Sequence, residues 1–197
     1  MKKLAEYINE AYEVNFRDRV QPKTTSELKQ IIKDAFNHNI YNLNFIDTSK
    51  ITDMSFLFYT YINGNLDVSN WDMSNVTKAD HMFYKCKTFN CDLSNWNVSN
   101  VTDMYSMFIA CENFKGKGLE NWDVSNVKDI GSMFAGCENF NCDLSNWDMS
   151  NVTDMGYVFI DCEKFKGKGL ENWNVINVTS MRHMFDGCNK LTIPDWY

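Results

Sequence analysis

Large apolar residues recur along this chain at a nearly constant step, with polar residues filling the positions between them. Phenylalanine and tryptophan mark two of these columns most clearly. The columns contain Phe58, Phe83, Phe108, Phe134, Phe159 and Phe185, and Trp71, Trp96, Trp122, Trp147, Trp173 and Trp196. Because the tryptophan steps are 25, 26, 25, 26 and 23 residues, the pattern predicts one supersecondary unit stacked about six times, which is a solenoid.

Two shorter periodicities predict the structure inside each unit. Apolar residues two positions apart, as at Trp96 and Val98, are typical of a short strand with both side chains inward. The segment from Met104 to Cys111 carries apolar residues at i, i+3, i+4 and i+7, the spacing of one helix face. Residues 44–197 are therefore expected to form α/β repeats of 25 or 26 residues, each with a strand, a turn, a short helix and a return loop.

Residues 1–43 are predicted to form a helical arm and an N-terminal cap. Within residues 24–38, Thr24 and Glu27 make a capping box, and an apolar stripe follows at helical spacing. The stripe contains Leu28, Ile31, Ile32, Ala35 and Phe36. Because an open solenoid end exposes core, this helix is expected to cover that end. Residues 2–14 are expected to form a second helix, which either packs on the cap or projects as an arm.

Polar residues also recur in columns, and we interpret them as structural. The asparagine column contains Asn75, Asn100, Asn126, Asn151 and Asn177, and the aspartate column contains Asp53, Asp103, Asp129 and Asp154. Asparagine amides satisfy backbone groups at tight corners, and aspartates favour the start of a helix. The alternatives are glycosylation, since Asn-Val-Thr is an acceptor motif that the repeat itself generates, and calcium binding, for which the usual glycine-rich pattern is missing.

The repeat motif resembles that of the BspA-like leucine-rich repeat proteins. Residues 147–155, Trp-Asp-Met-Ser-Asn-Val-Thr-Asp-Met, are similar to a repeat variant abundant in mycoplasma surface lipoproteins and in some gut bacterial and phage proteins. Residues 184–194 look like the more general BspA-type repeat, and residues 22–48 look like the segment that precedes such repeats. The resemblance implies a right-handed leucine-rich-repeat-like solenoid, and it implies little about activity.

Charge and the N-terminal sequence narrow the location and the partners. The formal net charge is −7 and the isoelectric point about 4.9, which argues against nucleic-acid binding. No stretch is long and apolar enough for membrane insertion. The first residues, Met-Lys-Lys-Leu-Ala-Glu, lack the apolar run of a signal peptide. We expect a cytoplasmic or virion-associated protein, or a cell-surface protein if its leader lies outside this sequence.

The seven cysteines are expected to be free thiols. Five of them, Cys86, Cys111, Cys137, Cys162 and Cys188, form one inward column in which a small apolar residue packs well. Cys91 and Cys142 are 51 residues apart. That is two units, or ~10 Å, which exceeds disulfide reach. Neither a metal site nor a cofactor is predicted, because no cysteine or histidine has zinc-ligand spacing.

Outward positions vary from unit to unit, so they are the candidates for recognition. The partner-binding candidates are Phe56, His81, Tyr84, Tyr105, Ile109, Tyr157, Ile160, Arg182, His183, Trp196 and Tyr197. Ordinary solvated surface is the alternative interpretation. Two Lys-Gly-Lys-Gly segments, residues 115–118 and 166–169, either receive an acidic partner or are flexible, longer turns whose glycines take positive φ.

The function expected from these features is a non-enzymatic protein–protein interaction module with a protein partner. Catalysis is not predicted, because His81 and His183 lie four units apart, ~19 Å by the spacing of stacked units. Self-association through the C-terminal rung is a further prediction, since the chain reaches Trp196 and Tyr197 without a polar cap. The alternatives are a structural or assembly component of a virion, and a phage-encoded inhibitor that binds a host protein.

Overall fold

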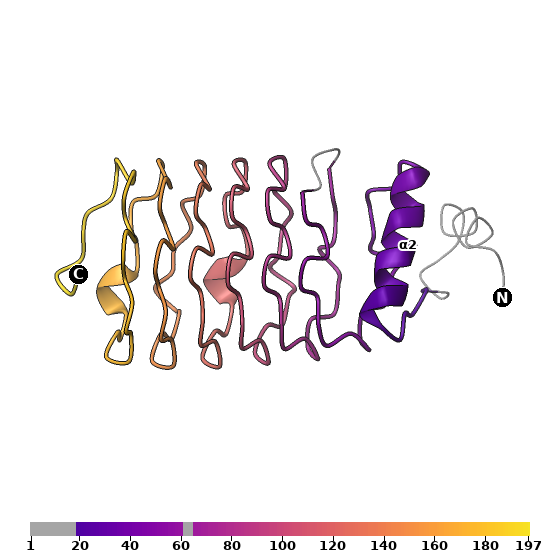
Figure 1. The fold of residues 1–197 in the computed structure, drawn as a ribbon, viewed down its shortest axis with the longest axis horizontal. Coiled ribbons are helices and arrows are strands. Elements are labelled where there is room, and N and C mark those ends of the chain that lie inside the picture. The colour runs from indigo at the N-terminus through magenta and orange to yellow at the C-terminus, as the bar shows by residue number, and fades with distance from the viewer. Residues whose placement is uncertain (1–18, 61–64) are drawn as a thin grey trace.

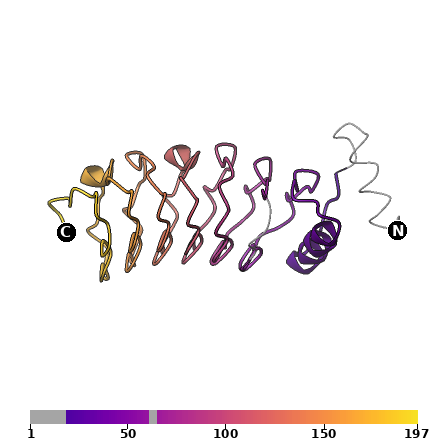
Figure 2. The ribbon, with the colours of Figure 1, turned by 90° about the horizontal axis from the view of Figure 1, so that it is seen from above.

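A computed structural model describes residues 19–60 and 65–197. The backbone is mostly irregular and surrounds a large buried aromatic core. Helix α2 (Thr25–Asn37) and two 3-10 turns, η1 (Leu119–Asn121) and η2 (Leu170–Asn172), are the regular elements of this described part. From residue 43 onward, segments of about 25 residues lie side by side in a row that runs from α2 to the C-terminus (Figures 1 and 2). We call these segments coils 1 to 6: residues 43–67, 68–92, 93–118, 119–143, 144–169 and 170–197.

Adjacent coils are joined through single parallel bridges rather than through strands. One row of bridges connects Asp53, Lys78, Asp103, Asp129, Asp154 and Ser180 in order. No bridge extends into a strand within residues 19–60 and 65–197, so the predicted strand at each tryptophan is wrong. Trp96 and Val98 are nevertheless 4% and 1% exposed. They face inward because Asn97 accepts the Ser99 amide in a tight turn.

The short helix predicted in each unit is also wrong. Between Met104 and Cys111, Ser106 and Ala110 both have φ 55°, in the left-handed region, so no helix forms. The amides of even-numbered residues donate to coil 4, as from Phe108 to the Met133 carbonyl at 2.9 Å, and the odd-numbered amides from 107 to 111 close four-residue β-turns. The i, i+3, i+4, i+7 burial pattern remains, because each such turn returns an apolar side chain to the core.

Aromatic rings stack from coil to coil through the core. Successive members of the phenylalanine column have ring centroids 5.3 to 6.0 Å apart. Every tryptophan indole N–H donates to a backbone carbonyl 26 to 29 residues earlier in the chain, at 2.7 to 3.3 Å; for Trp147 the acceptor is Leu119. The tryptophan column therefore packs as core, and each indole is a second donor to a carbonyl that also accepts a backbone amide.

All seven cysteines are free, as predicted. The five column cysteines have a role that the sequence did not reveal: each thiol lies 2.9 to 3.0 Å from the phenylalanine carbonyl of the preceding coil. Burial raises the pKa of the Cys111 thiol well above its ordinary value, which keeps it protonated and able to donate.

The polar columns also bind backbone groups. The asparagine column donates from each Nδ2 to a carbonyl of the preceding coil at 2.6 to 2.8 Å. Each member of the aspartate column accepts the amide two residues later at 2.7 to 3.0 Å. The structural interpretation of both columns is confirmed, although the aspartates cap turns rather than helices.

Helix α2 caps the first coil, as the sequence predicts. Thr24 accepts the Glu27 amide, while the Glu27 carboxylate accepts the Lys23 amide in place of a strict capping box. Thr25 Oγ1 donates to the Asp53 carbonyl at 2.7 Å and Lys29 Nζ to the Ser55 carbonyl at 3.2 Å. Between coils 1 and 2, the corresponding carbonyls of coil 2 accept backbone amides of coil 1. The two α2 side chains thus make the hydrogen bonds to coil 1 that the backbone amides of a further coil would make. The predicted helix at residues 2–14 lies outside the described residues.

Candidate interaction surface

Five rings gather on the outward face of coils 1 to 3. We name Phe56, Tyr59, His81, Tyr84 and Tyr105 the N-terminal aromatic cluster. Phe56 stacks on His81 with ring centroids 4.4 Å apart, and Tyr59 stacks on Tyr84 at 4.6 Å. Tilted contacts of 5.8 and 5.6 Å join the two stacks, and Tyr105 meets His81 edge-on at 5.2 Å. The rings hold one another in a fixed arrangement.

These rings remain exposed despite their mutual contacts. Phe56, Tyr59 and Tyr105 are 45%, 49% and 41% exposed, and His81 and Tyr84 are half-buried. Phe56 and His81 have φ of 56° and 54°. Non-glycine residues favour this region only when the surroundings enforce it. The hydrogen bonds between coils enforce it here, and they aim both side chains outward.

A second aromatic group lies at the far end of the same face. Tyr157 stacks on His183 at 5.2 Å, the Arg182 guanidinium lies 5.0 Å from the Tyr157 ring centroid, and His183 Nδ1 is 2.7 Å from Asp186. Coil 4 lies between the two groups and carries smaller side chains at the corresponding positions. Ser106 occupies the same repeat position as Phe56 and His81 but is 2% exposed, so this position does not face outward in every coil, although the sequence predicts that it does.

Gly131 makes room for the last ring of the N-terminal aromatic cluster. A Cβ atom on Gly131 would come within 3.2 Å of the Tyr105 ring.

The predicted candidates Ile109 and Ile160 are each half-buried on coils 3 and 5. The face that the sequence presents as one stripe is therefore divided into two aromatic groups.

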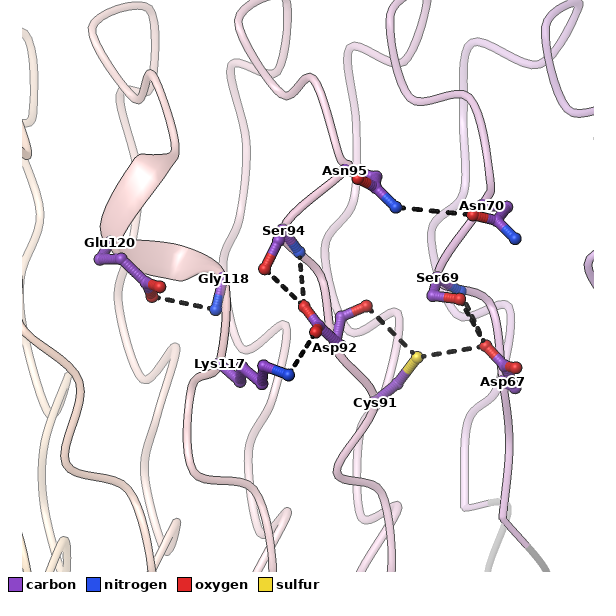
Figure 3. Close-up of polar contacts among 10 residues, drawn as sticks. All are labelled: Asp67, Ser69, Asn70, Cys91, Asp92, Ser94, Asn95, Lys117, Gly118 and Glu120. Carbon is purple, nitrogen blue, oxygen red and sulfur yellow. Dashed lines mark hydrogen bonds and ion pairs between the residues drawn. The ribbon is translucent and has the colours of Figure 1, made fainter.

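A polar edge with alternating charges runs along the coils (Figure 3). Lys117 Nζ lies 2.6 Å from an Asp92 carboxylate oxygen, and the equivalent pair Lys168 and Asp143 is 2.5 Å apart. The hydrogen bond from Lys117, followed by those from Ser94, lowers the pKa of Asp92 to about 2. The two Lys-Gly-Lys-Gly segments thus meet carboxylates of this chain.

Both glycines of each Lys-Gly-Lys-Gly segment have positive φ, as predicted. At Gly118 φ is 97°, and a Cβ atom there would lie 2.2 Å from the Ser94 backbone nitrogen. The same residue precedes η1, and Gly169 precedes η2 in the same way. These segments therefore produce the 26-residue steps.

A hollow of about 390 Å³ lies beside Asp67 and Cys91, at the part of the polar edge where the aspartate has no lysine partner among the described residues. Asp67 lacks a lysine from the next coil; its carboxylate accepts from Ser69 and Asn42, and the Cys91 thiol lies 3.7 Å away. Burial, with help from the Asp67 charge, raises the pKa of Cys91 to about 11. The thiol is therefore a poor nucleophile at neutral pH.

Residues 26–118 and 106–196 each match a protein family described as "Mycoplasma protein of unknown function, DUF285". The chain belongs to this family. Comparison with curated proteins and with solved structures gave no match. In this DUF285 protein the first matching segment contains the N-terminal aromatic cluster, and the second contains Tyr157 and His183. The mycoplasma part of the resemblance seen in the sequence is thereby supported at the level of the family.

The described part of the DUF285 protein offers little for other kinds of site. No group of three or more histidine, cysteine, aspartate or glutamate side chains is placed to hold a metal ion within residues 19–60 and 65–197. In the same residues, no helix has the length and apolar character needed to cross a bilayer.

The structure brings together four of the sequence-predicted candidates, Phe56, His81, Tyr84 and Tyr105. Tyr59 was not among the predicted partner-binding residues, although the sequence places it in the same outward column as Tyr84. Tyr157, Ile160, Arg182 and His183 lie elsewhere on the same face.

The last two candidates lie in coil 6. Trp196 stacks on Trp173 at 6.2 Å and donates to the Leu170 carbonyl at 2.7 Å, as the other tryptophans do with their neighbours. Tyr197 is 50% exposed. Trp196 therefore has a packing role in the DUF285 protein whether or not it also contacts a partner.

Proposed function

We propose that this DUF285 protein is a right-handed leucine-rich-repeat-like solenoid that acts as a non-enzymatic protein–protein interaction module. The observation that supports this proposal is the N-terminal aromatic cluster. It combines three rings exposed by 41% to 49% with a rigid mutual arrangement. Tyrosine and other aromatic residues held in this way supply contact area at a low entropic cost, which is typical of interaction hot spots.

The repeated inter-coil hydrogen bonds and the inward columns support the solenoid part of the proposal. A repeat architecture offers a broad exterior surface. The alternatives from the sequence, a virion or assembly component and a phage-encoded inhibitor of a host protein, use the same kind of surface. Location in the cytoplasm, in a virion or at a cell surface stays a prediction.

The test is a pull-down from an extract of the organism that encodes the chain. The bait is compared with a Tyr84→Glu/Tyr105→Glu variant and with Ile176→Glu, which changes a side chain that is 82% exposed and lies in coil 6. Circular dichroism checks that all three proteins are folded. We expect a protein captured by the wild-type chain to be lost from the double variant and kept by Ile176→Glu. Capture unchanged by the double variant would refute the role of the cluster.

Self-association through the C-terminal rung remains a separate proposal with a structural constraint. In the other coils, backbone amides donate to carbonyls of the next coil, and coil 6 has the equivalent amides at the end of the row. The matching carbonyls of coil 1 already accept hydrogen bonds from Thr25 and Lys29. A head-to-tail stack would therefore require α2 to move. Sedimentation of the wild-type chain at tens of micromolar tests it, and a monomeric mass would count against it.

A further inference from the structure

Each coil contributes one eight-residue segment to the outward face. We call these the outward segments: residues 53–60, 78–85, 103–110, 129–136, 154–161 and 180–187. Parallel bridges join their first residues from coil to coil, so residues at equal positions lie in line along the row. The N-terminal aromatic cluster occupies coils 1 to 3, whereas Gly131 and Ala135 are buried on coil 4. The face is therefore bulky at its N-terminal end and shallow at its middle.

Opposite charges lie at matching positions on coils 2 and 5. Lys78 and Lys85 are the first and last residues of the outward segment of coil 2. Asp154 and Asp161 hold the same two positions on coil 5. None of these four side chains forms an ion pair with another of residues 19–60 and 65–197. Coils 2 and 5 are each second from an end of the row, so the opposite charges are symmetric about its middle.

This symmetry distinguishes two ways in which two copies of the chain can meet through the outward face. Both have a two-fold axis in the plane of contact. If the coils of the two copies run in the same order, the first residue of each outward segment faces the last residue of the same segment. Lys78 then meets Lys85, which is a like-charged contact. Asp154 likewise meets Asp161, so this arrangement is unfavourable.

If the coils run in reverse order, coil 1 faces coil 6, coil 2 faces coil 5 and coil 3 faces coil 4. Residues at equal positions of the outward segments then face one another. Lys78 meets Asp154 of the second copy, and Lys85 meets Asp161 of the second copy. Each pair occurs twice because the contact is symmetric. The charges therefore favour the reversed order.

The apolar side chains also fit the reversed order. Tyr84 faces the half-buried Ile160 of the second copy. Ile109 faces Ala135, which is 6% exposed and leaves room for the larger side chain. The bulky rings of one copy thus lie against the smaller side chains of the other, which is the shape complementarity that a specific interface needs.

Polar groups at the ends and the middle of the row complete the contact. Arg182 faces Ser55, whose hydroxyl donates to the Asp80 carboxylate, so the guanidinium comes beside a carboxylate of the second copy. Asp103 and Asp129 are the like-charged residues that the reversed order brings together among the outward segments. Each of these two carboxylates already accepts an amide of its own turn. The two lysine–aspartate pairs and the arginine contact outweigh this single like-charged pair.

The size of the face is sufficient for a weak dimer. Six coils ~4.8 Å apart make it ~29 Å long. Eight extended residues span at most ~26 Å, and the turns within each outward segment shorten this to roughly 20 Å. Each copy therefore buries roughly 600 Å², or roughly 1,200 Å² in total, at the lower end of specific interfaces. We expect a dissociation constant in the micromolar range.

We propose that the outward face is the interface of a two-fold dimer, in which a second copy of this chain binds with its coils in reverse order. The N-terminal aromatic cluster of each copy lies against coils 4 to 6 of the other. This inference rests on the proposed interaction function and names a second copy as the partner of that surface. The arrangement is closed and ends at two copies, whereas a head-to-tail stack would continue to grow.

The test is sedimentation equilibrium of the full chain from about 1 to about 200 μM in low salt. We expect the mass to rise with concentration from 23.0 kDa to twice that value and no further. A monomeric mass throughout this range would overturn the inference. Species larger than a dimer that increase with concentration would indicate an end-to-end stack instead and would also overturn it.

Charge reversals at one pair of facing residues test the order of the coils. Lys85→Asp alone and Asp161→Lys alone each place like charges at both symmetric contacts, so each should raise the dissociation constant at least ~10-fold. Lys50→Asp is the control, because it makes the same change of charge in coil 1 at an exposed turn outside the outward segments. It should leave the dissociation constant within about twofold of the wild type.

An equimolar mixture of Lys85→Asp and Asp161→Lys should form a dimer at concentrations at which each variant alone is a monomer. In the mixed dimer the aspartate introduced at position 85 faces the lysine introduced at position 161, and the unchanged Lys85 and Asp161 face each other. Within one copy these positions are three coils apart, ~14 Å, so no contact inside a chain can produce this rescue. Rescue also shows that both variants are folded.

Other outcomes separate this inference from the proposed function. Unchanged dimers of both single variants, or a mixture that stays monomeric, would show that the outward faces do not meet in reverse order. If the wild type is a monomer while Tyr84→Glu/Tyr105→Glu still loses a captured protein, the inference is wrong and the proposed function stands. If the mixture forms the dimer and that double variant keeps its captured protein, the inference stands and the cluster has no role in capture.

Discussion

Gly118 gives the sharpest test of how closely the coils approach one another. Its φ is 97°, and an added Cβ atom would meet three backbone atoms of residues 93 and 94 at 2.2 to 2.7 Å. Backbone atoms cannot move aside as a flexible side chain can, so Gly118→Ala must push the two ends of coil 3 apart. Gly136 is the matched control, because it also has positive φ, 71°, but its Cβ would have no contact closer than 3.5 Å.

The two substitutions differ by the cost of this clash. The unfavourable φ costs alanine about 1–2 kcal/mol at either position. Overpacking adds about 1–3 kcal/mol at Gly118 alone. We therefore expect Gly118→Ala to lower the free energy of unfolding by about 2–5 kcal/mol and Gly136→Ala by about 1 kcal/mol. The low value for Gly136 is supported by the equivalent residue of coil 3, Ala110, which has φ 55°.

The measurement is equilibrium unfolding in urea followed by tryptophan fluorescence, with the free energies compared at equal m-values. If Gly118→Ala proved no more destabilising than Gly136→Ala, the close approach of Gly118 to residues 93 and 94 would be incorrect. A similar cost at both positions would assign the whole effect to φ.

Three further changes test other contacts. Trp147→Phe removes the 2.8 Å indole hydrogen bond to the Leu119 carbonyl, which keeps the Trp122 amide as its other donor at 3.1 Å, so urea unfolding should show a loss of about 1–3 kcal/mol from the lost hydrogen bond and the smaller ring. Lys117→Met should raise the pKa of Asp92 from about 2 toward its ordinary value, as measured by NMR titration. Because the pKa of Asp92 is lowered in the folded state, the ion pair stabilises the fold above the ordinary aspartate pKa, and this stabilisation disappears as pH falls toward 2. The wild type and Lys117→Met should therefore differ in their free energy of unfolding at neutral pH and become similar in acid. Burial raises the pKa of Cys142 to about 12, so iodoacetamide should modify it slowly at pH 7 in the folded chain and rapidly in denaturant, as followed by mass spectrometry.

The inward columns could be predicted from the sequence, because stacking requires every coil to bury the same positions. The backbone between them could not. A helix face and a series of overlapping four-residue β-turns both return a side chain to the core at i, i+3, i+4 and i+7. The difference lies in left-handed residues such as Phe56 and Tyr157, whose residue types carry no signal for positive φ.

The aromatic cluster was partly predictable for a related reason. The columns identify which residues are neighbours in adjacent coils, and so they place Phe56 beside His81. They do not show the orientation of each ring on the surface. Tyr105 lies over Gly131, and Ser106 is buried beneath the outward face, because of side-chain sizes in adjacent coils.

The paired ion contacts on the polar edge have a consequence for how such a chain changes length. Asp92 and Asp143, and likewise Lys117 and Lys168, are 51 residues apart, and residues 91–96 have the same sequence as residues 142–147, Cys-Asp-Leu-Ser-Asn-Trp. Recombination between gene segments that encode these identical stretches would remove or add 51 residues in frame. Each product would retain the indole, thiol, asparagine and lysine contacts at its new junction. Evolution can thus lengthen or shorten this molecule by two coils at a time without redesigning an interface.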